Sequence, residues 1–312
     1  MGTVFDYLDW RGDISFGEVG LGEVDALILS SICYVDFENI VPSAFDKKPI
    51  PLLTAAKSYL RAHKGEKAYM GAIIPSSVLT LLAKAAKTKR FAGVRLLGYL
   101  NRVNKDEETQ FCALSFLLDD GSLFIAYRGT DDTLIGWKEN FNMSFMDAIP
   151  AQLSAVEYLN AAGGVTAGRI NVGGHSKGGN LAFFASVRCN EAVKERIGTA
   201  FSYDGPGFTQ RFIDSDDYQS AKGKLRSLIP ESSIVGLLLE QEDTYEVVKS
   251  TESGLMQHDP FSWEILGASF IKLDDVTKES KLIDKKITEI LEDIENPSIT
   301  AIPDGVAVMV VE

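Results

Sequence analysis

The chain has 312 residues, 45% hydrophobic and 24% charged, a composition typical of soluble globular proteins large enough to bury a core. It carries 31 basic and 44 acidic side chains, so its formal net charge is −13. Such an acidic balance argues against nucleic acid or an anionic membrane surface as an electrostatic partner.

The cysteines and the first residues bear on the cellular compartment. Cys33, Cys112 and Cys189 are odd in number, scattered and next to apolar residues, which favours buried free thiols over a disulfide framework or a metal site. Asp6 and Asp9 stand where a signal peptide needs an apolar stretch, and no apolar run approaches the length of a membrane span. We expect a cytoplasmic protein with no integral membrane segment, no metal and no cofactor; its oligomeric state stays open.

The first ninety residues are expected to be mainly helical, and a β-rich block follows. Apolar periodicity predicts helices over 23–35, 51–63 and 76–89. Strands are predicted at 94–100, 110–118 and 123–127. The Asp120-Gly121 turn joins the last two strands into a hairpin.

From residue 144 onward, predicted helices and strands alternate. A helix over 144–162 precedes a strand that starts at Ile170. Further strands are expected at 199–203, 224–229 and 245–249. An acidic amphipathic helix over 274–295 ends at Asn296-Pro297. Antiparallel strands followed by such alternation predict an α/β fold with a mixed, mostly parallel sheet flanked by helices.

The most informative stretch is 170–185, which reads Ile-Asn-Val-Gly-Gly-His-Ser-Lys-Gly-Gly-Asn-Leu-Ala-Phe-Phe-Ala. A short apolar strand ends in glycines, a serine lies between Gly174 and Gly178, and a helix-compatible run follows. This is the order of a nucleophile elbow, in which side chains at the flanking positions would collide with the neighbouring strand or helix. The pattern predicts Ser176 as a nucleophile at a helix N-terminus. The alternative is a glycine-rich phosphate loop, although no Gly-Lys-Ser/Thr end follows.

A serine nucleophile needs a base, and histidine is the usual one at neutral pH. His63 lies in a Lys- and Ala-rich helix and is expected to be solvated. His175, beside the nucleophile, is expected to fill space and to make one hydrogen bond. His258 lies in a loop that follows Ser176 in the chain order of an α/β-hydrolase, and it is therefore the predicted base.

The acid that orients His258 should follow a strand between Ser176 and His258. Asp204 comes directly after the strand at 199–203, in a glycine-rich turn, and is preferred. Glu231, after the next strand, and Asp243 are its rivals. The alternative role for Asp204 is that of a turn residue that bonds its own backbone.

An oxyanion hole needs two donors close to the carbonyl oxygen of the substrate. One is expected to be the N–H of Lys177, the residue after the nucleophile. The other is expected from Arg128-Gly129-Thr130, where Thr130 offers both its N–H and its hydroxyl.

These residues resemble a known family. Tyr127-Arg-Gly-Thr-Asp-Asp-Thr-Leu-Ile-Gly-Trp137 and Gly174-His-Ser-Lys-Gly-Gly-Asn-Leu-Ala182 are similar to the Phe-Arg-Gly-Thr…Trp and Gly-His-Ser-Leu-Gly-Gly-Ala-Leu-Ala signatures of class 3 (triacylglycerol) lipases. Over residues 3–275 the chain more closely resembles a bacterial α/β-hydrolase family related to those lipases. Its marks here are Tyr7-Leu-Asp-Trp-Arg-Gly-Asp13, Asp204-Gly-Pro-Gly-Phe208, Ile229-Pro-Glu-Ser-Ser-Ile-Val-Gly236 and Gln257-His-Asp-Pro-Phe-Ser-Trp263.

The resemblance implies an α/β-hydrolase fold with extra N- and C-terminal helices. It also implies Ser176 as nucleophile, His258 as base, and Thr130 with Lys177 as the oxyanion hole. There is one departure: where class 3 lipases carry their acid, in an Asp-Ile-Val-Pro-like string, this chain has Ser233-Ile-Val-Gly. The preferred acid therefore remains Asp204.

We expect an α/β-hydrolase domain over 1–275, including a helical segment over 1–90, and a helical tail over 276–312. The predicted function is that of a serine hydrolase that cleaves a carboxylic ester, in the manner of a lipase or esterase, through an acyl-enzyme on Ser176. The partner is then a small-molecule or lipid ester. Two alternatives stay open: a non-catalytic interaction protein of the same fold, and a thioesterase or peptidase that uses the same triad.

Overall fold

The computed structural model describes residues 2–64, 77–104, 109–129, 146–240, 245–283 and 285–286. Within these residues the chain forms a nine-stranded sheet and a two-stranded hairpin. The large sheet contains, in spatial order, β1 (Ile50–Pro51), β2 (Arg95–Asn104), β3 (Thr109–Leu117), β4 (Leu123–Tyr127), β5 (Ile170–His175), β6 (Ile197–Tyr203), β7 (Leu225–Pro230), β8 (Glu246–Val248) and β11 (Lys272–Leu273). The hairpin pairs β9 (Ile265–Leu266) with β10 (Ser269–Phe270).

The sheet is mixed. Its strands run antiparallel from β1 to β4 and parallel from β4 to β8, and β11 pairs antiparallel with β8. Parallel neighbours need crossover connections, which are usually helical. The crossovers contain α7 (Pro150–Ala162), α8 (Lys177–Arg188), α9 (Glu191–Lys194), α10 (Gln210–Ile213) and α11 (Asp216–Ala221).

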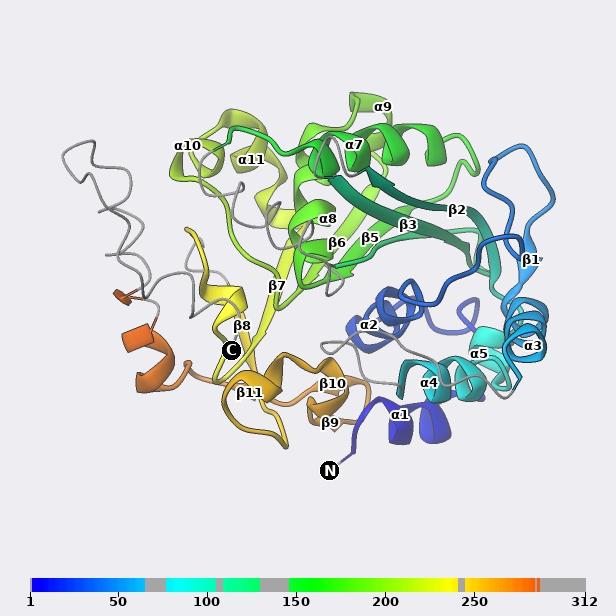
Figure 1. Ribbon diagram of the computed structural model, residues 1–312, viewed down its shortest axis with the longest axis horizontal. Helices are drawn as coiled ribbons and strands as arrows, with labels where there is room; N and C mark the ends of the chain where they lie inside the picture. Colours follow the sequence, from blue (N-terminus) through cyan, green and yellow to red (C-terminus); the bar gives the residue numbers. More distant parts are fainter. Residues whose placement is uncertain are drawn as a thin grey trace.

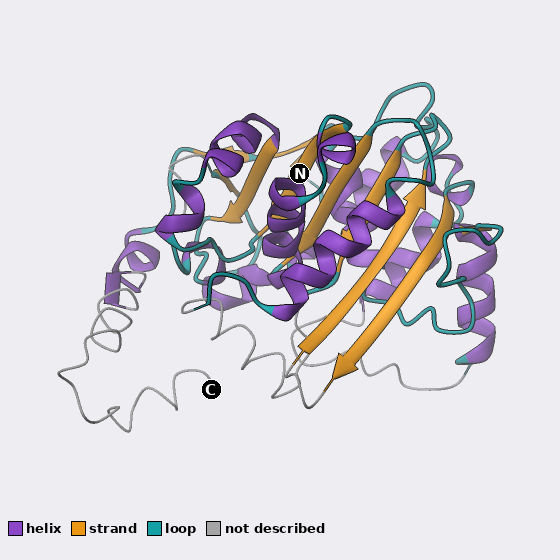
Figure 2. Ribbon diagram, turned by 90° about the horizontal axis from the view of Figure 1, so that it is seen from above, coloured by secondary structure: helices purple, strands orange, loops and turns teal. Residues whose placement is uncertain are grey.

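Helices cover both faces of the sheet (Figures 1 and 2). The crossover helices α7 and α8 pack on one face, and the N-terminal helices pack on the other, with α2 against β4 and β5. The N-terminal set consists of α1 (Val4–Arg11), α2 (Glu23–Ile32), α3 (Leu52–Ala62), α4 (Ser77–Ala85) and α5 (Lys89–Ala92).

Strand β4 shows why both faces are covered, because all of its residues are buried. Phe124 and Ala126 pack with the N-terminal helices, whereas Leu123, Ile125 and Tyr127 pack with α7 and α8. Successive side chains of a strand point to opposite faces of a sheet. A strand that is apolar at every position therefore requires a layer on each side.

The pairing of the central strands brings distant segments to one edge. Tyr127 at the end of β4 lies opposite Gly174, and His175 at the end of β5 lies opposite Tyr203 at the end of β6. The carboxyl ends of these parallel strands meet at the same edge, where α/β proteins place their ligand sites. The segments that follow β4, β5 and β6 converge there.

The architecture is an α/β-hydrolase fold with a mostly parallel mixed sheet flanked by helices, as predicted. The β3–β4 hairpin and the bounds of β4 also match the prediction. The helix expected over 76–89 is wrong in detail, because Thr88 caps a separate helix, α5, by accepting a hydrogen bond from the N–H of Phe91.

Other helices also differ from their predicted bounds, and the one expected over 23–35 ends at Ile32. The helix expected from residue 144 begins at Pro150, because proline is favoured in the first turn of a helix. The C-terminal amphipathic helix begins at residue 278, and its predicted part beyond 286 lies outside the described residues.

Cys33, Cys112 and Cys189 are buried free thiols. Among the described residues, no cluster of His, Cys, Asp and Glu has an arrangement able to hold a metal ion. No helix in the described part of the chain has both the length and the apolarity to cross a membrane. The division into 1–275 and 276–312 stays a prediction.

Candidate active site

Ser176 lies in a sharp turn between β5 and α8, with φ 57° and ψ −135°. Residues with a side chain rarely adopt this conformation, which costs about 1–3 kcal/mol and persists only where the surrounding structure enforces it. A Cβ at Gly174 would lie 2.2 Å from the carbonyl carbon of Gly178, and a Cβ at Gly178 would lie 2.1 Å from the carbonyl oxygen of Tyr127. Both flanking glycines are therefore required by close backbone approach, as the elbow pattern predicts.

The elbow places Ser176 at the N-terminus of a twelve-residue helix. The backbone N–H of Ser176 donates to the carbonyl of Tyr203 on β6, which ties the turn to the next strand. Lys177, the predicted oxyanion donor, is the first residue of α8, and its side chain is 1% exposed and donates to the carbonyl of Gln110. Its ammonium group therefore lies beneath the surface, while its backbone N–H belongs to the first turn of the helix.

Asp204 follows β6 and meets His258. Its Oδ2 lies 2.6 Å from Nδ1 of His258, and its Oδ1 accepts hydrogen bonds from Oγ of Ser233 at 2.5 Å and from the N–H of Gly236 at 3.1 Å. The carboxylate is buried, and its backbone has φ 50°, a conformation that aspartate tolerates better than most residues. Both oxygens are held, so the carboxylate presents one fixed acceptor to the imidazole.

Glu231, the first rival, does not take this place. The backbone N–H of Glu231 donates to the carbonyl of Val248, and its carbonyl accepts from the N–H of Thr277. The hydrogen bond of His258 Nδ1 goes to Asp204 instead. Asp243 lies outside the described residues.

The loop of His258 is clamped by its neighbours in the sequence. Gln257 is buried; its Oε1 accepts from the N–H of Ser232, and its carbonyl accepts from Nε1 of Trp263. Asp259 caps the following short helix by accepting from the N–H of Phe261. The segment from Gln257 to Trp263 therefore fixes the backbone on both sides of the histidine by these hydrogen bonds.

The other two histidines occupy different environments. His63 is exposed and stacks on Tyr59, in agreement with the prediction that it is solvated. His175 is buried and makes two kinds of contact rather than the one hydrogen bond expected, with Tyr34 through Nδ1 and with the carbonyl of His258 through Nε2. Burial, and secondarily the nearby His258, hold the pKa of His175 well below its usual value.

The segment after β4 reaches the elbow. A Cβ at Gly129 would lie 3.1 Å from Cβ of Ser176, so this backbone passes directly beside the nucleophile. Thr130, the next residue and the second predicted oxyanion donor, lies outside the described residues.

A small hollow of about 10 Å³ with a mixed polar and apolar lining lies beside α8. It is formed where the start of α7, the first turns of α8 and the turn after β6 meet, and it is lined by Met146, Asp147, Gln152, Asn180, Phe184, Gly207, Phe208, Thr209 and Phe212. Phe208 and Phe212 stack with ring centroids 4.6 Å apart. Asn180 fixes this corner, because its amide donates to the carbonyl of Gly207 and its Oδ1 accepts from Gln152.

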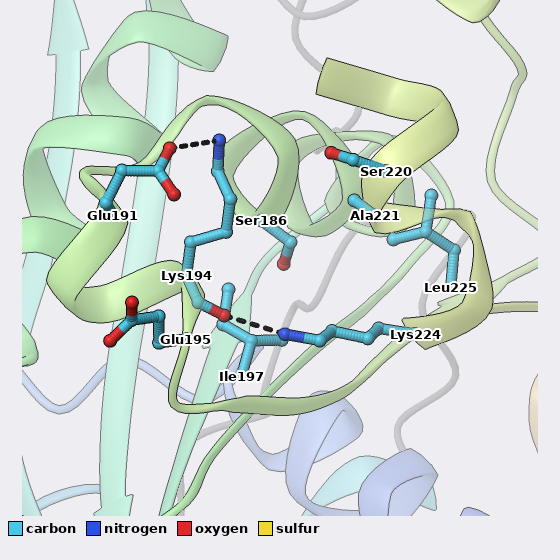
Figure 3. A pocket seen from close by; sticks show the side chains of 9 residues that line it. All are labelled: Ser186, Glu191, Lys194, Glu195, Ile197, Ser220, Ala221, Lys224 and Leu225. Atoms are coloured by element: carbon cyan, nitrogen blue, oxygen red, sulfur yellow. Dashed lines mark hydrogen bonds and ion pairs between the residues drawn. The ribbon is translucent and has the colours of Figure 1, made fainter. Parts of the chain in front are cut away.

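A larger cavity, of about 170 Å³, lies at the opposite edge of the sheet, near the amino ends of β6 and β7 (Figure 3). Its two ammonium groups are already engaged: Lys194 pairs with Glu191, and Lys224 donates to the carbonyl of Lys194. The cavity is distant along the strands from Ser176, and it takes no part in the candidate site.

Sequence reasoning missed two contributors to the site, Tyr34 and Ser233. Tyr34 follows α2 and is 141 positions away from its partner His175, so no local pattern signals the contact. Ser233 was marked in the sequence, because it stands where class 3 lipases carry their acid. Its contact with Asp204 could be seen only in the structure.

Comparisons with known proteins give one family match and several similar solved structures. The sequence profile of the Mbeg1-like family matches residues 85–304, and no curated protein matches the chain. Among solved structures, the fold is similar to a fungal lipase in complex with an inhibitor, with 13% identity over 72% of this chain and 76% of that chain and a TM-score of 0.43. It is also similar to Rhizomucor miehei lipase in its propeptide complex (13% identity, 57% and 70% coverage, TM-score 0.35). A third similar structure is the extracellular lipase LipA of Serratia marcescens (15% identity, 71% and 43% coverage, TM-score 0.38).

Proposed function

This chain belongs to the Mbeg1-like family, and we propose that it is a serine hydrolase that cleaves carboxylic esters through an acyl-enzyme on Ser176. The observation that carries the proposal is the 2.6 Å hydrogen bond between Asp204 and His258 at the edge of the sheet where the strained Ser176 elbow stands. A buried carboxylate bound to a histidine beside an elbow serine is the constellation that activates a hydroxyl for acyl transfer.

In the proposed mechanism, His258 Nε2 removes the proton from the Ser176 hydroxyl as its oxygen bonds to the ester carbonyl carbon. The tetrahedral intermediate then collapses, the carbon–oxygen bond to the alcohol breaks, and His258 returns the proton to the leaving alcohol. Water next attacks the acyl-enzyme with His258 again as base, which releases the carboxylic acid and restores the serine. Asp204 holds the Nδ1–H tautomer and stabilises the imidazolium formed in each step.

Negative charge on the carbonyl oxygen is stabilised by backbone donors. The N–H of Lys177 at the start of α8 supplies one, aided by the helix dipole, and Thr130 after Gly129 supplies the other. Removing one such donor typically raises the barrier by about 2.7–4 kcal/mol.

The substrate is proposed to be an ester with an apolar acyl group, from a small molecule or a lipid. Leu255 and Met256 are more than half exposed within three residues of His258, so the loop that carries the proposed base presents exposed apolar side chains. From the sequence alone, we also propose that the enzyme acts in the cytoplasm.

The choice of Asp204 bears on the non-catalytic alternative. That alternative rested on the serine found at the acid position of class 3 lipases. Ser233 donates to Asp204, so a carboxylate and the residue at the lipase position share one hydrogen-bonded cluster at His258. This supports a working triad with its acid on the turn after β6.

A panel of p-nitrophenyl esters of graded acyl length, assayed with wild-type protein and Ser176→Ala, tests the proposal. We expect hydrolysis of at least one ester and a loss of roughly 10³-fold or more in Ser176→Ala, because the nucleophile is removed. Equal hydrolysis by both proteins, or none by either, would overturn it. Thioesters and p-nitroanilides in the same panel separate the thioesterase and peptidase alternatives.

A further inference from the structure

The structure contains a hydrogen-bonded chain that links the two sides of the candidate site. We propose that His175 and Tyr34 are positioning residues that hold His258 and the segment at Gly129 in one frame around Ser176. The inference rests on the proposed function for its catalytic consequence, but the geometry it describes is testable without activity.

The first link joins His175 to His258. Nε2 of His175 lies 2.8 Å from the carbonyl oxygen of His258, and the two rings lie with their centroids 4.5 Å apart. A carbonyl oxygen only accepts, so Nε2 of His175 carries the proton. The residue that precedes the nucleophile therefore holds the backbone of the proposed base directly.

The second link joins His175 to Tyr34. Burial lowers the pKa of His175, so its ring is neutral at neutral pH and its Nδ1 has no proton. Nδ1 is then an acceptor for the hydroxyl of Tyr34, 3.2 Å away, and the carbonyl oxygen of His175 is a second acceptor at 3.3 Å. Burial raises the pKa of Tyr34, so this hydroxyl keeps its proton.

The third link joins Tyr34 to the segment after β4. The N–H of Gly129 donates to the Tyr34 oxygen at 3.1 Å, and a Cβ at Gly129 would lie 2.4 Å from that oxygen. The chain thus runs from the Gly129 N–H through the Tyr34 hydroxyl and the His175 ring to the His258 carbonyl. The hydroxyl proton of Tyr34 has two acceptors, and both belong to His175, so Tyr34 is tied to the residue before the nucleophile.

This chain spans the groups whose relative positions the reaction needs. One end controls the backbone of His258, and the other end controls the residue before Thr130, the proposed oxyanion donor. Neither side chain is proposed to touch the substrate. They act by setting the positions of His258 and Gly129 relative to Ser176. A displacement of about 1 Å in such a site lowers the rate roughly 100-fold.

Two substitutions at residue 175 distinguish the effect of the hydrogen bond to His258 from the effect of side-chain volume. His175→Leu fills similar space but has no donor. In His175→Gln, the amide nitrogen Nε2 is as many bonds from the backbone as Nε2 of the histidine, and it still donates. We expect His175→Leu to lower kcat by roughly 10- to 100-fold with a smaller change in KM, and His175→Gln to stay within a few-fold of wild type. Equal losses in the two variants, or no loss in His175→Leu, would overturn the proposal.

A second measurement does not depend on activity. In wild-type protein the Nδ1 proton of His258, shared with Asp204, gives a downfield imidazole resonance in proton NMR, assigned by its loss in His258→Asn. We expect this resonance to be lost or broadened in His175→Leu and kept in His175→Gln. If wild-type protein shows no hydrolysis but the resonance behaves this way, the proposed function fails and the positioning stands; an unchanged resonance in His175→Leu overturns the positioning.

Tyr34→Phe tests the same hydrogen-bonded chain if His175→Leu does not fold. It removes only the central hydroxyl, and we expect a several-fold loss of kcat and a shifted His258 resonance. Tyr158→Phe is the matched control, because it also removes a buried hydroxyl, bonded to Gly98 and Ser115 on the sheet, and should leave both readouts unchanged. In Tyr34→Phe/His175→Leu the two losses should not add, since both cut one chain; fully additive losses would contradict a shared frame.

Discussion

Asp204 and His258 lie 54 positions apart in the sequence and are joined by a hydrogen bond of 2.6 Å between Oδ2 and Nδ1. The second carboxylate oxygen is occupied by Ser233 and Gly236, so the acid has a single orientation. The other ring nitrogen, Nε2, is the one proposed to take the proton.

Asp204→Asn should lower kcat by roughly 10³- to 10⁴-fold, because an amide no longer selects the Nδ1–H tautomer or stabilises the imidazolium. Glu231→Gln, the matched control, should retain most of the activity, since Nδ1 of His258 bonds to Asp204. Steady-state kinetics with a p-nitrophenyl ester and circular dichroism of each variant check the result. A large loss in Glu231→Gln with little loss in Asp204→Asn would reverse the assignment.

Moving the acid should be tolerated in part. Oγ of Ser233 lies 2.5 Å from Oδ1 of Asp204, so a short carboxylate at residue 233 starts within reach of the same space. We expect Asp204→Ser/Ser233→Asp to recover at least tenfold in kcat/KM over Asp204→Ser alone. A double variant no better than the single one would show that the turn after β6 is the one workable origin for the acid.

The part of the site that could be predicted from the sequence is the part that short, local sequence motifs mark. The elbow, His258 and Asp204 each stand at the end of a strand or in a distinctive turn, and parallel pairing brings such ends together. The bounds of β4 were predictable because an apolar run of five residues is bounded by a turn and a glycine.

The rest depends on long-range contact. His175 was expected to make one hydrogen bond, since nothing near it in the chain reveals that α2 delivers Tyr34 to its other nitrogen. Likewise the helix that begins at Pro150 was predicted too long, because apolar periodicity does not mark where the preceding segment leaves the helix.

The burial of His175 predicts how stability depends on pH. Its pKa in the folded protein is well below the usual value of about 6.5, so between the two values the unfolded chain binds more protons than the folded one. The free energy of unfolding should therefore fall as pH drops below about 6.5, by up to about 1.4 kcal/mol per pH unit from this group. The groups that face it are Tyr34 and His258, with Asp204 behind His258.

Urea unfolding of wild-type protein and His175→Gln between pH 5 and 7.5 measures this contribution. We expect the wild-type curve to be the steeper of the two in that range, because glutamine does not titrate. Parallel curves would contradict the neutral state of His175.

Leu255 and Met256 test the substrate class. Both are more than half exposed beside His258, and replacing them by serine removes apolar surface without touching the proposed catalytic groups. If the natural ester is a lipid, Leu255→Ser/Met256→Ser should lower hydrolysis of emulsified long-chain esters several-fold and leave soluble short-chain esters unchanged. Leu266→Ser, at the exposed β9 position, is the control. Equal effects on both ester types would contradict a lipid-contacting role.

The most direct test of the account is covalent labelling of the proposed nucleophile. An alkyl fluorophosphonate should phosphonylate the wild-type protein once, with loss of fluoride, and peptide mass spectrometry should place the adduct on Ser176. Ser176→Ala should not be labelled, and His258→Asn should be labelled at least 100-fold more slowly, because the base is missing. Labelling of Ser176→Ala at the wild-type rate, or a folded wild-type protein that stays unlabelled, would contradict the assignment of this site as a serine hydrolase.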